Sequence, residues 1–303
     1  MCRGSLAALG MTVAALLAGA CCSSLPRLAP KRIAFPAPRA RFDSIIETAG
    51  QFNDAGRGGR AVPIHTYAPQ GAPGRLPVVI VSHGIGEDRD SYAYLGRALA
   101  RAGFYVVHVT HAGTDRAKKE NWINRPLDVS FVLDRLANDA NLDTDHVAVV
   151  GHSAGAFTAF AAAGMRGDEG QSLRDPRVKV IVPISMPRIP GSYDAIDIPV
   201  LHLTGTCDTS LIYRTFPRHR RIPFEQSNNP RQVLVTLRGV NHDMFSAKQD
   251  PHHGAIAAIT IAFLRAWMQD DAEARAWFEE PGRGEALGVP LSVERKPGIA
   301  TAK

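Results

Sequence analysis

A serine stands between two glycines in residues 151–155, which read G-H-S-A-G. The apolar run 147–150 precedes this pattern and an Ala/Phe-rich stretch, 154–164, follows it, so a buried strand leading into a helix is expected. A serine on such a sharp turn is exposed for nucleophilic attack, and the flanking glycines leave room for the turn. The pattern and its surroundings therefore predict Ser153 as a nucleophile.

A serine hydroxyl attacks efficiently only when a base takes its proton and an acid orients that base. Two strand-like runs downstream each lead into a loop with a suitable side chain, Asp208 in the first and His242 in the second. The two residues occupy matching positions after successive strands. We expect His242 to be the base and Asp208 to be the acid, with Asp243 and Asp197 as nearby alternatives for the acid.

The tetrahedral intermediate of acyl transfer needs backbone N–H donors, one from the residue after the nucleophile and one from a loop after an early strand. Ala154 supplies the first donor. The apolar run 77–82 reads as a strand buried on both faces, and glycines in the loop after it let the Ile85 amide approach a substrate oxygen. We expect His83 to brace this loop by hydrogen bonds. His152 precedes the nucleophile within the G-H-S-A-G turn. Its side chain could line the substrate pocket or cover it, and the sequence leaves both possibilities open.

Five segments of the chain resemble one group of known enzymes; they are residues 77–115, 125–136, 147–164, 220–225 and 234–245. From about residue 45 to residue 278, the chain is similar to the platelet-activating-factor acetylhydrolase-like and predicted dienelactone hydrolase group of α/β-hydrolases. The resemblance implies a triad of Ser153, Asp208 and His242 and an oxyanion hole at Ile85 and Ala154. Dienelactone hydrolase itself uses a cysteine nucleophile, so the resemblance predicts the fold and not the substrate.

The chain also resembles cutinase-like polyester hydrolases, which carry a similar turn around the nucleophilic serine. These enzymes usually have a C-terminal disulfide, so the cysteines of this chain are relevant to the comparison. The chain has four cysteines. Cys2 lies in an expected signal sequence, and Cys21 and Cys22 lie at its end. Only Cys207 belongs to the folded body, so neither that bridge nor a disulfide framework is expected. Cys207 is expected to be a small packed residue.

Composition favours a single domain, because 303 residues with 45% hydrophobic content can bury one substantial core. Strand-like runs alternate with helical stretches, which predicts an α/β-hydrolase fold with a mainly parallel sheet and helices on both faces. The catalytic domain is expected to span residues 42–280. The connections 164–178 and 184–199 are close to ordinary loop length, so no large cap domain is expected. Strands are expected at 104–110, 147–150, 178–184, 199–204 and 233–237, an edge hairpin at 41–48 and 61–68, and a last helix at 255–268.

The N-terminus predicts export. Residues 6–20 are apolar and too short for a membrane span with stop-transfer flanks, so residues 1–21 read as a signal peptide. Its end resembles the bacterial lipobox, which predicts lipid and membrane attachment at Cys21, with Cys22 as another register and free secretion as the alternative. Residues 22–41 are expected to be a flexible tether. Residues 281–303, a charged tail that contains Gly and Pro, are expected to be poorly ordered.

The net charge of +6 suggests a mild preference for anionic surfaces or substrates. A basic cluster between Asp208 and His242 could receive an anionic group or be a solvated loop. The pair His252-His253 lacks the partners and spacing of a metal site, and nothing resembles a nucleic-acid module. The basic cluster comprises Arg214, Arg218, His219, Arg220 and Arg221.

Together these features predict an exported serine hydrolase that cleaves small or short-chain carboxylic esters through an acyl-enzyme, without a cofactor. A lipase or cutinase-like polyester hydrolase is the alternative, followed by a peptidase. A non-catalytic binding scaffold on the same fold stays open as a different class. The combination of nucleophile, base, acid and oxyanion donors argues against such a scaffold, because a protein that only binds a ligand does not need all of them.

Overall fold

Runs of valine, isoleucine and leucine form the centre of one sheet, which has eleven strands in the described residues, in the order β1-β10-β11-β9-β8-β7-β6-β4-β5-β3-β2. The structure, a computed structural model, describes residues 24–25, 32–113, 117–167, 170–211 and 214–296. The neighbouring strands from β9 to β5 are all parallel, as is typical of a sheet covered on both faces. The strands are β1 (Arg32–Phe35), β2 (Ile45–Asp54), β3 (Arg60–Pro69), β4 (Leu76–Ser82), β5 (Tyr105–Val109), β6 (Leu142–His152), β7 (Val178–Ile184), β8 (Val200–Cys207), β9 (Gln232–Asn241), β10 (Gly282–Ala286) and β11 (Val289–Arg295).

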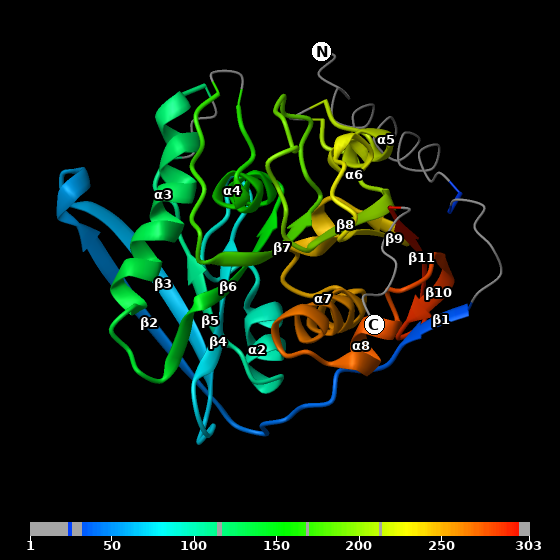
Figure 1. The fold of residues 1–303 in the computed structure, drawn as a ribbon, viewed down its shortest axis with the longest axis horizontal. Helices are drawn as coiled ribbons and strands as arrows, with labels where there is room; N and C mark the ends of the chain where they lie inside the picture. The colour runs from blue at the N-terminus through cyan, green and yellow to red at the C-terminus, as the bar shows by residue number, and fades with distance from the viewer. Residues whose placement is uncertain (1–23, 26–31, 114–116, 168–169, 212–213, 297–303) are drawn as a thin grey trace, which may run out of the picture.

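Helices cover both faces of the sheet, as Figure 1 shows. Side chains alternate along each strand, so Val78 and Ile80 of β4 pack in the core beneath α3 and α4. Val79 and Val81 face the opposite core, beneath α2 and α7. The predicted arrangement, a mainly parallel sheet between two helical layers, is confirmed. The helices are α2 (Ala93–Arg101), α3 (Lys119–Leu136), α4 (Ala154–Ala163), α5 (Pro217–Arg220), α6 (Ile222–Gln226), α7 (His253–Met268) and α8 (Ala272–Ala276), with short 3-10 helices η1 (Ala55–Arg57) and η2 (Asp243–Phe245).

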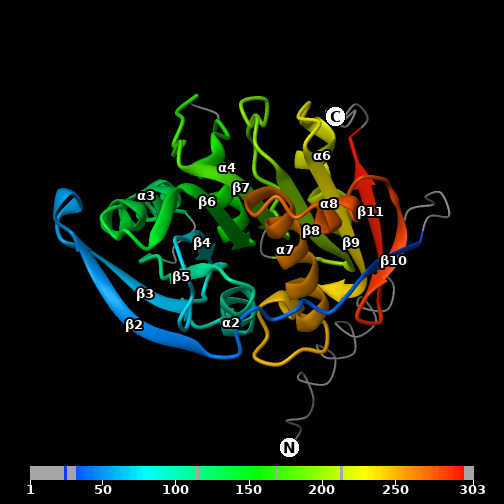
Figure 2. The same ribbon diagram turned by 60° about the horizontal axis from the view of Figure 1, so that its bottom comes forward.

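The expected edge hairpin is present and longer than predicted. β2 and β3 pair antiparallel over their whole lengths, and β3 joins the sheet through β5. Figure 2 shows this hairpin projecting at one end of the sheet, with β1, β10 and β11 at the other end.

The expectation of a poorly ordered tail after residue 280 is wrong for residues 282–295. They form β10 and β11, and β11 extends the sheet antiparallel to β9. The reason is that apolar residues alternate along β11, so that Leu291 and Val293 are completely buried. The Gly and Pro content of this segment made the alternation easy to miss in the sequence. The expected tether is likewise structured in part, because β1 pairs parallel with β10 and buries Ile33 and Phe35. The expected signal peptide, residues 1–21, lies outside the described residues.

The connections after the nucleophile helix are simple. Between α4 and β8, the described residues outside β7 contain no helix, and Arg166 forms isolated bridges with Ser172 and Ser192. No cap domain is inserted in the described part of these connections. Of the helices in the described ranges, none is both long and apolar enough to cross a bilayer.

Candidate active site

Ser153 lies on a strained turn between β6 and α4, with φ 54° and ψ −116°. A positive φ is unfavourable for a residue with a side chain, and such strain concentrates at functional sites. At the two glycine positions of the motif there is no space for a side chain. A Cβ atom on Gly151 would lie 2.0 Å from the carbonyl oxygen of Gly155, and one on Gly155 would lie 1.9 Å from that of Ser82. The strand, turn and helix predicted for this motif are therefore present.

The side chains of Ser153, His242 and Asp208 lie in one hydrogen-bonded row. His242 Nε2 is 3.2 Å from Ser153 Oγ, and His242 Nδ1 is 3.0 Å from Asp208 Oδ1. With a proton on Nδ1, the imidazole donates to the carboxylate and accepts from the hydroxyl. The carboxyl ends of parallel strands meet at one edge of the sheet, which is why loops after β6, β8 and β9 bring these three residues together. A serine in this arrangement can be activated as a nucleophile.

Asp208 is completely buried and strongly held. Its Oδ2 accepts hydrogen bonds from Ser185 Oγ at 2.5 Å and Thr204 Oγ1 at 2.7 Å, and Arg220 Nη2 lies 2.9 Å from its Oδ1. Burial alone raises the pKa of Asp208, but the charge of Arg220 and the hydrogen bonds from His242 and Ser185 bring that pKa well below its ordinary value of 3.8. The carboxylate therefore stays ionised.

Arg220 corrects one of the expectations for the basic cluster. It is not solvated: its side chain is fully buried, and it also donates to the backbone carbonyls of Ser185 and Met186. Arg221 pairs with Glu225 and Glu294. Arg214 and Arg218 are exposed, as a solvated loop requires.

His242 is held in its neutral form. Burial is the main cause that lowers the pKa of His242 below its ordinary 6.5, and the nearby charges of His152 and Arg220 act in the same direction. The hydrogen bond to Asp208 opposes them. A neutral imidazole is the form that can accept a proton from Ser153.

The loop after β4 lies against the nucleophile, since a Cβ on Gly84 would be 3.4 Å from Ser153 Cβ. The Gly84 N–H is already used, because it donates to Glu87 Oε2 at 2.7 Å. The next amide along this loop is that of Ile85, which is partly exposed. Ala154 is the first residue of α4, where backbone N–H groups have no acceptor within the helix.

The two histidines beside the motif have supporting contacts. His83 braces its loop as expected: its Nδ1 lies 2.6 Å from the Gly84 carbonyl oxygen, and its Nε2 accepts from the His111 N–H at 2.9 Å. His152 packs against the ring of His242. It is buried, its ring centroid lies 4.7 Å from that of His242, and its Nδ1 lies 2.6 Å from Tyr92 Oη.

The alternative acids lie elsewhere. Asp197 is exposed and pairs with Arg174 at 3.0 Å. Asp243 is exposed and begins η2. Neither is among the hydrogen-bond partners found for His242 within the described residues.

The side chains of His252 and His253 each contact a neighbouring residue. His252 Nδ1 lies 2.6 Å from Asp250 Oδ1, and His253 stacks on Tyr94 with ring centroids 3.6 Å apart. Across the part of the chain that the structure describes, no group of three or more His, Cys, Asp or Glu side chains could hold a metal ion.

For Cys207, next to Asp208, a small packed residue and no disulfide were expected, and the absence of a disulfide is wrong because Cys207 is disulfide-bonded. The other three cysteines lie outside the described residues. The expectation failed because the other three cysteines were assigned to the signal sequence and its end, which left no expected partner for Cys207.

Comparison with known proteins agrees with the fold. The PET hydrolase-like family matches residues 29–286. Cutinase 2 of Thermobifida cellulosilytica is 24% identical over 239 residues, which cover 76% of this chain and 81% of that protein. A cutinase of Thermobifida fusca is also 24% identical over 239 residues, 66% of its length. A bifunctional acetylxylan esterase/xylanase of Neocallimastix patriciarum is 25% identical over 162 residues, which are 50% of this chain and 22% of that enzyme. The family match spans most of the chain, which therefore belongs to the PET hydrolase-like family of α/β-hydrolases.

Proposed function

We propose that this carboxylic ester hydrolase uses Ser153 as its nucleophile, His242 as its general base and acid, and Asp208 as the acid that orients His242. The observation that carries the proposal is the row of hydrogen bonds from Asp208 through His242 to a serine on a strained turn. A triad is recognised by this geometry and these roles, whatever the fold.

In the proposed reaction, Ser153 Oγ bonds to the ester carbonyl carbon while its proton passes to His242 Nε2. The carbon–oxygen bond to the alcohol then breaks, and the leaving alkoxide takes that proton. Water attacks the resulting acyl-enzyme, again losing a proton to His242 Nε2, and the acid product leaves with Ser153 restored. No cofactor is needed for these steps.

We propose that the Ile85 and Ala154 amides stabilise the oxyanion. Two observations support this. Gly84 brings the loop into contact range of Ser153 while its own N–H is held by Glu87. Ala154 presents the first amide of a helix, where the positive end of the helix dipole also favours an anion.

Small or short-chain esters are the proposed substrates, because short connections in the described chain leave the site without an inserted cap. A polyester is the second candidate. It is favoured by the PET hydrolase-like family match and by the cutinases among the relatives. The two differ in the size of the substrate and share the same chemistry.

Labelling with a fluorophosphonate and hydrolysis of nitrophenyl esters from two to sixteen carbons test the proposal. The wild-type protein should be labelled and Ser153→Ala should not. Rates should fall with chain length for a short-chain esterase, and release of soluble products from a polyester film would select the second candidate. An equally active Ser153→Ala variant would refute the assignment of the nucleophile.

We also propose export, with lipid attachment at Cys21. The disulfide at Cys207 supports export, because disulfides persist in oxidising compartments. Signal cleavage before Cys21 would remove Cys2, and lipidation would modify the Cys21 thiol. Mass spectrometry of the N-terminal peptide tests it, since an unmodified N-terminus beyond Cys22 would mean free secretion.

A further inference from the structure

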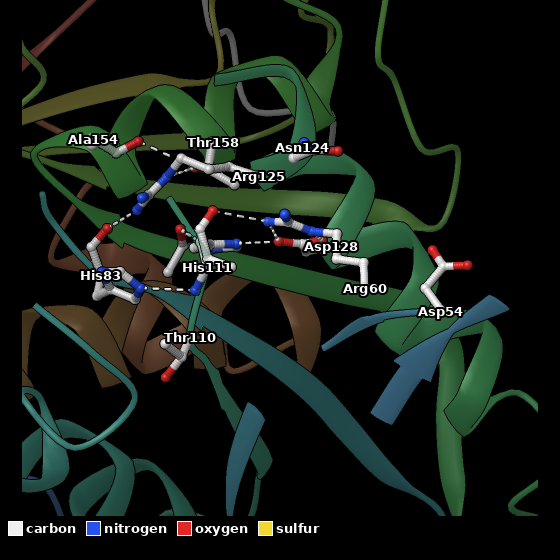
Figure 3. A network of polar contacts seen from close by, with 12 residues as sticks. Asp54, Arg60, His83, Thr110, His111, Asn124, Arg125, Asp128, Ala154 and Thr158 are labelled. Carbon is white, nitrogen blue, oxygen red and sulfur yellow. Dashed lines mark hydrogen bonds and ion pairs between the residues drawn. The ribbon is translucent and has the colours of Figure 1, made fainter. Parts of the chain in front are cut away.

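A buried polar network lies behind the proposed oxyanion hole, outside the Ser–His–Asp row (Figure 3). Within this network, the fully buried Arg125 of α3 lies between two segments that are far apart in sequence. One segment is the loop after β4, which contains His83 and Ile85. The other is the beginning of α4 at Ala154. These are the two segments from which the oxyanion donors come.

Arg125 is hydrogen-bonded to both segments. Its Nη2 donates to the carbonyl oxygen of His83, and its Nε donates to Thr158 Oγ1 at 3.1 Å. The Thr158 hydroxyl in turn donates to the carbonyl oxygen of Ala154 at 3.1 Å. A threonine in a helix often makes such a bond to the carbonyl four residues earlier, but here the same hydroxyl also accepts from a buried guanidinium. The hydroxyl thus has one donor and one acceptor role, both satisfied.

We propose that Arg125 and Thr158 are positioning residues that fix the spacing between the Ile85 and Ala154 amides, an inference that rests on the proposed function. An oxyanion hole works only when both donors lie about 3 Å from the developing oxyanion. The two segments share no chain connection close to the site, so their separation depends on contacts between them. The rigid, planar guanidinium spans that gap with donors at fixed directions.

The loop end of this bridge is itself immobilised. His83 accepts from the His111 N–H, and the His111 ring bonds Ser82 Oγ at 2.9 Å and Asp128 Oδ2 at 3.0 Å. The two bonds of His83 require a neutral imidazole, because its Nδ1 donates to a carbonyl oxygen and its Nε2 accepts from an N–H. Burial, and then the charge of Arg125, lowers the pKa of His83 well below its ordinary value and that of His111 to about 4.

The far end of the network is anchored by an ion pair. Arg60 donates to both oxygens of Asp128 at 2.8 Å, and Arg57 lies 2.8 Å from Asp128 Oδ1. Two cations on one carboxylate offset the cost of burying it and keep Asp128 ionised. Asp128 thereby holds His111, which holds His83 against Arg125.

The substitutions Thr158→Val and Thr158→Ser distinguish a role of the hydrogen bonds from Arg125 through Thr158 to Ala154 from a role of Thr158 in packing alone. Valine keeps the shape and loses the hydroxyl, whereas serine keeps the hydroxyl. We expect Thr158→Val to lower kcat about tenfold to a hundredfold with KM changed less than about threefold, since donor misplacement acts on the transition state. Thr158→Ser should stay within about twofold of wild type on both constants.

The decisive readout is the ratio of rates on an ester and on its thionoester, in which sulfur replaces the carbonyl oxygen. An intact oxyanion hole favours oxygen, so Thr158→Val should lower this ratio about tenfold while Thr158→Ser preserves it. Arg125→Lys keeps the positive charge but loses the planar guanidinium with its several donors, so it should lower this ratio of rates too. Arg177→Lys is the control, because Arg177 also donates through Nε and Nη2, in its case to the two carboxylate oxygens of Asp175 away from the site.

Unchanged kcat and ratio in folded Thr158→Val would overturn the positioning role. So would an equal loss of kcat in Thr158→Val and Thr158→Ser, which would point to packing alone. Ser153→Ala is measured in parallel. If it keeps full activity the proposed function fails, whereas an inactive Ser153→Ala beside a normal Thr158→Val leaves that function standing and removes only the bridge.

Discussion

The guanidinium of Arg220 lies 2.9 Å from Asp208 Oδ1, and both side chains are completely buried. The same Nη2 is 3.0 Å from His242 Nδ1. Arginine has only donors, so Arg220 and the protonated Nδ1 of His242 share one carboxylate oxygen. A permanent positive charge therefore sits beside the base that has to become positive during the reaction.

Replacing Arg220 should move the pH dependence of activity. kcat/KM is lost as the pH falls through the pKa of His242, because only the neutral imidazole accepts the Ser153 proton. Burial first, and also the charge of Arg220, hold this pKa below 6.5. Removing the charge in Arg220→Gln favours the imidazolium and raises the pKa of His242, so the acidic limb of kcat/KM should move to higher pH.

The control for this shift is Arg221→Gln, because Arg221 pairs with Glu225 and Glu294 instead of the triad. Its pH profile should match the wild type. An acidic limb that stays in place, or moves to lower pH, in a folded Arg220→Gln variant would contradict the role given to this charge.

The nucleophile and base should behave as one unit. Ser153→Ala and His242→Ala should each lower kcat by about 10⁴-fold or more, and the double variant should be little worse than either. Steady-state rates with nitrophenyl esters measure this, with circular dichroism as the test of folding. Losses that multiply in the double variant would mean that the two residues act independently.

Asp208→Asn should preserve the geometry and lower kcat by about 10⁴-fold, because the amide stabilises the wrong imidazole tautomer. Asp243→Asn is the matched control, since Asp243 is an exposed neighbour of His242. It should retain nearly full activity. The opposite ranking would identify Asp243 as the orienting acid.

The glycine after the nucleophile should tolerate no side chain. In Gly155→Ala the new Cβ would lie 1.9 Å from the Ser82 carbonyl oxygen, so we expect loss of activity and a fall of about 3 kcal/mol in the free energy of unfolding. Gly167→Ala meets nothing within 4 Å and should change that free energy by less than about 0.5 kcal/mol. Urea titration compares them, and equal stabilities would show that the turn can relax.

Truncation after Glu280 removes β10 and β11 and uncovers the edge of β9, so the product should be insoluble or inactive. Truncation after Lys296 leaves both strands and should be tolerated. Soluble expression and ester hydrolysis distinguish the two products. Full activity of the shorter product would mean that β9 needs no partner on that side.

The triad was predictable because its signals are local and its geometry follows from topology. Ser153, Asp208 and His242 each follow a strand, and parallel strands bring such positions to one edge. The structure brings the three side chains together as that topology requires. Their catalytic roles stay predictions until the variants are measured.

Other parts of the site carried no local signal. Arg220 belongs to a four-residue helix within a basic run, where solvation is the usual outcome, and only its tertiary contacts with Asp208 set it apart. Ser185 and Arg125 act through partners that are distant in sequence. At the C-terminus, the alternation in β11 spans too few residues to outweigh its composition.

The pairing of β1 with β10 joins segments from nearly opposite ends of the described chain. Contacts of such high sequence separation form late, because the whole intervening chain must be made and ordered first. During synthesis, the apolar side chains of Ile33 and Phe35 therefore lack their partner strand until residue 286 has emerged. Closing of this sheet edge therefore cannot begin before the C-terminal strands have been made.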